Sequence, residues 1–130
     1  MSGGNLFTMG IEWITPERAY ELLQKDWTYL DVRTVDEFTA GHVPGAKNIW
    51  FGQWNGPELI KNPRFLEIVA ANFPMDCNLI VSCHTGKERS IQAAERLNDA
   101  GFRNVLKMRG GFEEWCLRGL PIASESSSRR

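Results

Sequence analysis

The sequence has few of the residues that build metal sites, disulfide frameworks and membrane spans. Its 130 residues include three cysteines (Cys77, Cys83 and Cys116) and two histidines (His42 and His84), without a Cys-x-x-Cys pair. Three cysteines without a framework spacing indicate reduced thiols, and a zinc site is not expected. No apolar run approaches the ~20 residues that cross a bilayer. We therefore expect a cytoplasmic protein that needs no metal or cofactor and has no membrane contact.

The chain also lacks an excess of charge of either sign. It carries 15 basic and 16 acidic side chains and a net charge of −1, with 42% hydrophobic residues. Such a balance produces no long-range field that would recruit nucleic acid, so an anionic ligand has to be held by local donors. The length and composition are typical of one globular domain, which we expect to be a monomer.

Strand-like and helix-like segments alternate along the chain. We expect a flexible N-terminal arm over residues 1–9, without the features of a signal peptide, a domain over 10–122 and a polar tail over 123–130. Alternation of this kind predicts an α/β fold with a mostly parallel sheet and helices on both faces. The predicted strands are 11–14, 28–32, 47–49, 79–82 and 104–108. The first predicted helix starts at 15–16, and four more lie near 35–39, 63–73, 90–100 and 112–118. The stretch 51–62 is predicted as a loop.

A loop between a buried strand and a helix carries the clearest chemical pattern. The apolar strand 79–82 ends at Cys83, and a helix is expected from Ser90 onward. Ligands of parallel sheets bind at the carboxyl ends of strands. Successive backbone N–H groups of such a loop can surround an anion, with Gly86 supplying a backbone angle that other residues resist and Arg89 a planar set of donors.

The same positive surroundings favour the thiolate form of a cysteine at this place. A helix N-terminus and basic neighbours both stabilise the thiolate. A lone cysteine that ends a strand is often a small buried hydrophobic residue, which is our interpretation of Cys77 and Cys116. For Cys83 the loop features agree with one another, and we expect a catalytic nucleophile with Arg89 as its partner. The substrate-binding residues predicted in this loop are His84, Thr85, Gly86, Lys87 and Glu88.

Three motifs together resemble the rhodanese family. Residues 30–49 contain Asp-x-Arg, Glu-Phe and Gly-His-x-Pro-Gly-Ala-x-Asn, residues 83–89 form the cysteine loop, and residues 110–121 contain Gly-Gly, Trp and Gly-Leu-Pro. The resemblance spans about residues 11–122. It implies a five-stranded sheet and a sulfurtransferase in which Cys83 takes a sulfane sulfur from a small anionic donor such as thiosulfate. The resulting persulfide would pass its sulfur to a thiol or to cyanide.

One departure from the family pattern leaves the activity open. Five residues separate Cys83 from Arg89, where sulfurtransferases of this family usually have four. The longer spacing, with Glu88 directly before Arg89, is similar to the rhodanese-fold cell-cycle phosphatases and arsenate reductases. Ser82 stands where those enzymes usually have histidine, and the Gly-Leu-Pro block resembles sulfurtransferases. A phosphatase or arsenate reductase, and a non-catalytic binding module, therefore remain alternatives.

Further residues have two interpretations each. Asp31 and Arg33 end a predicted strand, where they can either support the loop and contact substrate or form a buried structural ion pair. His42 lies in a Gly-His-x-Pro-Gly turn and is expected to be a hydrogen-bonded turn residue. Trp50 and Trp54 flank a glycine and are candidates for a pocket wall.

Overall fold

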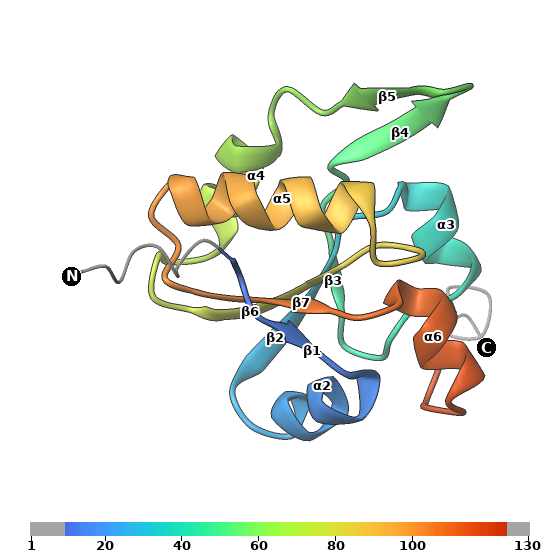
Figure 1. Ribbon diagram of the computed structural model, residues 1–130. Coiled ribbons are helices and arrows are strands. Elements are labelled where there is room, and N and C mark those ends of the chain that lie inside the picture. The colour runs from blue at the N-terminus through green and yellow to red at the C-terminus, as the bar shows by residue number, and fades with distance from the viewer. Residues whose placement is uncertain (1–9, 125–130) are drawn as a thin grey trace.

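The computed structural model describes residues 10–124 and contains a central five-stranded sheet with helices on both faces (Figure 1). The strand order is β1-β7-β6-β2-β3, and all neighbouring strands are parallel. The predicted α/β architecture is therefore confirmed. The sheet strands are β1 (Trp13–Ile14), β2 (Trp27–Asp31), β3 (Lys47–Asn48), β6 (Asn78–Ser82) and β7 (Asn104–Met108). The helices are α2 (Pro16–Leu23), α3 (Val35–Ala40), α4 (Phe65–Asn72), α5 (Glu88–Asp99) and α6 (Gly111–Leu117).

Two apolar clusters join the helices to the two faces of the sheet. On one face, α4 and α5 pack on Leu30, Leu79 and Val81. On the other, α2 and α6 pack on Tyr29 and Ile80, and Figure 1 shows these two helices on the side opposite α4 and α5. Adjacent residues of β2 and β6 alternate between the clusters, as expected for strands buried on both faces. Both strands are thereby fixed in the middle of the domain.

The two central strands end together at one edge of the sheet. Asp31 of β2 is paired in register with Ser82 of β6. The residues after these strands, Val32 and Cys83, are both buried. The predicted site residues that follow β2 and β6 are therefore neighbours at the carboxyl edge.

The segment predicted as a loop over 51–62 is instead largely a β-hairpin. Strands β4 (Gly52–Asn55) and β5 (Glu58–Lys61) pair antiparallel, and Gly56 at the turn has a φ of +63°. The prediction was wrong because the glycine and proline of the turn, with Asn55 before them, masked the strands on either side. The two residues between the strands are Gly56 and Pro57, and glycine at the first central position of a two-residue turn is a recognised hairpin signal.

Smaller differences lie at the ends of elements. Helix α5 begins at Glu88, so Glu88 and Arg89 belong to its first turn and not to the loop. Ala123, predicted as the first residue of the polar tail, exchanges two backbone hydrogen bonds of 2.8 Å with His42. The tail prediction is corrected at that residue, because its backbone is held by the domain. The rest of the tail from 125 and the N-terminal arm lie outside the described residues.

His42 is a turn residue, as predicted. Its Nδ1 lies 2.8 Å from the Phe38 carbonyl oxygen, and its ring stacks on Phe38 with centroids 3.9 Å apart. Between residues 10 and 124, no helix is long and apolar enough to cross a membrane.

Candidate active site

Cys83 directly follows the most deeply buried strand of the sheet. Strand β6 lies between β7 and β2, and Cys83 itself is 3% exposed. It belongs to the apolar cluster beneath α5, together with Val81. The strand therefore fixes the position of the sulfur at the end of the sheet, and the next residue begins the loop.

The backbone of the loop is oriented by α6. The carbonyl oxygens of Cys83 and His84 accept hydrogen bonds of 2.8 and 2.9 Å from the N–H groups of Phe112 and Glu113. Within the described part of the chain, the backbone N–H groups of residues 84–89 have no acceptor. The first turn of α6 thus engages loop carbonyls and leaves the loop N–H groups free for a ligand. Free N–H groups in succession form an anion-binding nest.

Glycines allow the loop and α6 to approach this closely. Gly86 has a φ of +73°, and a Cβ atom there would lie 2.7 Å from the backbone nitrogen of Gly110. A Cβ atom at Gly111 would lie 2.5 Å from the carbonyl oxygen of His84. Side chains at either position would collide with backbone that cannot move aside. The role of Gly86 in loop geometry is supported, and the partnership with the glycine pair was not anticipated from the sequence.

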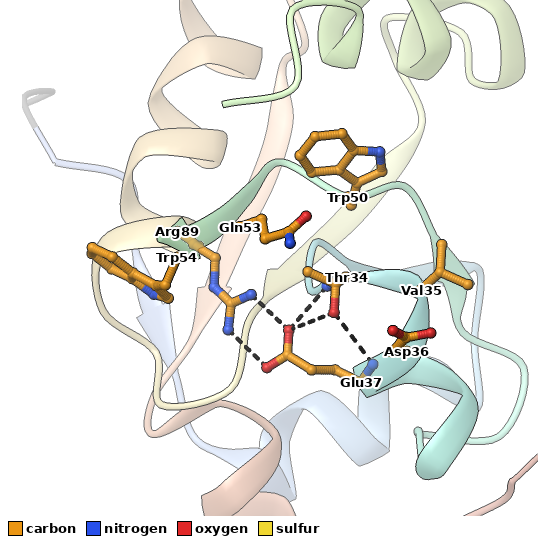
Figure 2. Close-up of a pocket in the computed structure, with 8 residues that line it drawn as sticks. All are labelled: Thr34, Val35, Asp36, Glu37, Trp50, Gln53, Trp54 and Arg89. Carbon is orange, nitrogen blue, oxygen red and sulfur yellow. Dashed lines mark hydrogen bonds and ion pairs between the residues drawn. The ribbon is translucent and has the colours of Figure 1, made fainter. Parts of the chain in front are cut away.

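The Arg89 guanidinium is not free at the edge of the loop, although its donors were expected to face an anion. It is 6% exposed, and its two terminal nitrogens donate to the Glu37 carboxylate at 2.7 and 3.1 Å, as Figure 2 shows. A third, long contact of 3.4 Å reaches the carbonyl oxygen of Gly52. An acidic side chain from α3 thus occupies the guanidinium donors that were expected to face an anion, and the catalytic role of Arg89 stays a prediction.

Glu37 is a site residue that the sequence reasoning considered only as a possible ion-pair partner of Arg89, beside Asp31. It closes a capping box at the start of α3: its Oε1 accepts from the Thr34 N–H at 3.0 Å, and the Thr34 hydroxyl accepts from the Glu37 N–H at 3.3 Å. Partial burial disfavours the carboxylate, but hydrogen bonds from Arg89 and Thr34 outweigh it and lower the pKa of Glu37 to about 2. The available signal was the Thr-x-x-Glu spacing of the capping box.

The side chains of the loop itself point to solvent. His84, Thr85 and Lys87 are exposed. Glu88 is exposed as well, and its carboxylate accepts from the Gln92 side chain at 3.1 Å along α5. Its carboxylate is thus directed along the helix surface, in contrast to the loop-facing role we had expected. Substrate contacts by His84, Thr85 and Lys87 stay a prediction.

Asp31 and Arg33 form the buried structural ion pair that was one of their two interpretations. They are 1% and 3% exposed, and the Arg33 terminal nitrogen lies 2.8 Å from the Asp31 carboxylate. Arg33 also donates to the Gly41 carbonyl at 2.7 Å and lies 4.3 Å from the ring centroid of Phe112. The Phe112 N–H donates to the Cys83 carbonyl oxygen, so the Asp31–Arg33 ion pair supports the cysteine loop through Phe112.

A pocket of about 470 Å³ opens beside Arg89, on the side of α3 and the hairpin (Figure 2). Trp50 and Trp54 line it, which agrees with their proposed place in a pocket wall; Cys83 is not among the lining residues. The remaining lining residues are Thr34, Val35, Asp36, Glu37, Gln53 and Arg89. Arg89 therefore connects this pocket to the end of the cysteine loop.

Comparisons with known proteins identify the family to which this chain is similar. The family model of the rhodanese-like domain matches residues 15–118. Thiosulfate sulfurtransferase 16, chloroplastic, of Arabidopsis thaliana is 43% identical over 103 residues, which are 79% of this chain and 85% of that protein. Thiosulfate sulfurtransferase GlpE of Haemophilus influenzae is 34% identical over 115 residues, which are 88% of this chain and 96% of that protein.

A solved structure extends the agreement to three dimensions. The crystal structure of a rhodanese-related protein from Thermoplasma volcanium superposes with a TM-score of 0.69 at 26% identity, covering 86% of this chain and 97% of that one. The name of the plant relative places that protein in the chloroplast, and the cytoplasmic location expected here stays a prediction. From its fold, the matched residues 15–118 and these relatives, the chain belongs to the family of rhodanese-like domains.

Proposed function

We propose that this chain is a sulfurtransferase in which Cys83 carries the transferred sulfur as a persulfide. The observation that carries the proposal is the loop after β6. Its carbonyls are held by α6, while its N–H groups from 84 to 89 have no acceptor among the described residues 10–124. Relatives named thiosulfate sulfurtransferases, 34% and 43% identical to this chain, support the same reaction class.

The chemistry has two balanced steps. The Cys83 thiolate attacks the outer sulfur of thiosulfate, the S–S bond of the donor breaks, and sulfite leaves with the bonding electron pair. An acceptor thiolate or cyanide then attacks the terminal sulfur of the persulfide, and Cys83 departs again as thiolate. Because both the persulfide and the departing sulfite are anionic, oriented N–H donors stabilise the charge that moves during both steps.

The test is the production of thiocyanate from thiosulfate and cyanide. Wild-type protein should turn over, Cys83→Ser should not, and intact mass after incubation with thiosulfate should show one added sulfur on Cys83. Arg89→Lys, which keeps the charge but loses the bidentate contact with Glu37 that holds the side chain beside the loop, should lower efficiency by ~10- to 150-fold. A wild-type rate no higher than that of the serine variant would reject sulfur transfer.

A phosphatase or arsenate reductase is the second candidate, favoured by the five-residue spacing between Cys83 and Arg89. A tetrahedral oxyanion would have to displace Glu37 from the Arg89 guanidinium, since both groups use the same donors. Thiosulfate is also a tetrahedral oxyanion and meets the same competition, so it is the relatives named thiosulfate sulfurtransferases that favour sulfur transfer. Hydrolysis of an aryl phosphate that depends on Cys83, or reduction of arsenate, without any thiocyanate formation would reverse the order of the two candidates.

A further inference from the structure

We infer that the pocket beside Arg89 binds the organic part of the sulfur acceptor and selects a small thiol that carries an ammonium group. The inference rests on the proposed function, because it assigns the second substrate of the same reaction. It concerns the wall built by Trp50, Trp54 and Asp36, none of which belongs to the cysteine loop.

The size of the pocket points to an acceptor larger than cyanide. Its volume is about 470 Å³, whereas one water molecule takes up ~30 Å³ of liquid. A diatomic ion would leave most of this space to water and would contact few of the lining side chains. A thiol with a short organic chain can contact both the apolar walls and the loop.

The charges of the lining residues point to a cation. Glu37 is neutralised by its bidentate contact with Arg89. Asp36 is exposed and, among residues 10–124, no side chain is hydrogen-bonded to its carboxylate, so the pocket retains one unbalanced negative charge. Two indoles lie in the same pocket, and indole faces attract ammonium groups. An anionic thiol would meet the Asp36 carboxylate with repulsion.

Arg89 joins this pocket to the cysteine loop. It lines the pocket and is the second residue of α5, directly after the loop that starts at Cys83. A thiol whose ammonium group lies near Asp36 can therefore extend its sulfur past Arg89 toward the persulfide. Its thiolate attacks the terminal sulfur, the S–S bond to Cys83 breaks, and the acceptor leaves as a persulfide.

The experiment measures discharge of the persulfide to small thiols that carry a positive, a neutral or a negative end group. Protein loaded with thiosulfate and freed of donor is mixed with cysteamine, 2-mercaptoethanol or 3-mercaptopropionate, and intact mass follows the loss of sulfur. Rates are divided by the cyanide rate of the same variant. Asp36→Asn should slow discharge to cysteamine by about two- to fivefold and should not slow discharge to 3-mercaptopropionate. Asp99→Asn, an exposed acid at the end of α5, is the matched control and should behave as wild type.

A second measurement does not depend on sulfur chemistry. Titration with tetramethylammonium should give a saturable change of indole fluorescence that is reduced in Trp54→Phe and weakened in Asp36→Asn. Normal loading followed by equal effects of Asp36→Asn and Asp99→Asn on cysteamine discharge would overturn the inference and leave the proposed function intact. If Cys83 takes up no sulfur, the proposed function fails first, and absence of the fluorescence change would then overturn the inference as well.

Discussion

At the scale of single residues, the Glu37–Arg89 pair is the feature with the clearest energetic consequence. Glu37→Gln removes the charge that neutralises a buried guanidinium, and we expect the free energy of unfolding to fall by about 1–3 kcal/mol. Urea denaturation measures the change. Glu67→Gln is the matched control, because Glu67 pairs with Arg64 in the same way but both side chains are about two-thirds exposed. Equal losses in the two variants would show that burial of Arg89 adds nothing to the pair.

The same pair predicts how stability responds to acid. The pKa of Glu37 is lowered from an ordinary 4.5 to about 2, so between these values the unfolded chain binds a proton that the folded protein does not. The stabilisation from Glu37 is therefore fully present above pH 4.5 and is lost as pH falls toward 2. The difference in unfolding free energy between wild type and Glu37→Gln should shrink over this range. A difference that stays constant down to pH 2 would contradict the assignment.

At the scale of elements, we expect the close contact between the cysteine loop and α6 to leave no room for a methyl group at Gly86. Gly86→Ala would place Cβ against the Gly110 backbone and should abolish sulfur transfer and destabilise the domain. Gly119 is the control, because its φ of +72° nearly equals the +73° of Gly86 but a Cβ there has no neighbour within 4 Å among residues 10–124. Gly119→Ala should lose only the ~1–2 kcal/mol of a left-handed alanine and keep activity. Comparable loss of activity in both variants would mean that glycine is required only for its left-handed backbone angle and not for the close contact with α6.

Some features of the helices and strands could be predicted from the sequence, and others could not. Alternating apolar strands and capped helices follow from local patterns, and Thr15 indeed accepts from the Arg18 N–H at the start of α2. The position of Cys83 at the end of a strand was likewise predicted from a local pattern, the apolar run that precedes it. The hairpin was missed because its turn residues are also loop residues. The ion pair of Arg89 with Glu37 was one of two possible pairings, beside Asp31, because it joins residues 52 positions apart. The capping box places Glu37 at the start of α3, but no local pattern determines which distant side chain it contacts.

At the scale of the whole molecule, the three thiols differ in burial and in charge environment. Cys83 is the most buried of them, while Cys77 and Cys116 are partly exposed. Burial raises the pKa of both Cys77 and Cys116, which keeps them as thiols at neutral pH. If access alone controlled alkylation, Cys83 would react last. If the loop N–H groups and the start of α5 stabilise its thiolate, Cys83 should react first with a small uncharged alkylating agent.

Peptide mapping after limited alkylation at pH 7 decides between these two orders. We expect label on Cys83 before Cys77 and Cys116, and we expect prior incubation with thiosulfate to add one sulfur to the labelled Cys83 peptide. Raising the pH should speed labelling of Cys77 and Cys116, because their raised pKa values keep them as thiols at pH 7. Cys83→Ser should leave the slow labelling of the other two unchanged. Labelling of Cys77 or Cys116 ahead of Cys83 would mean that Cys83 is a buried structural thiol, and the nucleophile of the proposed reaction would have to be withdrawn.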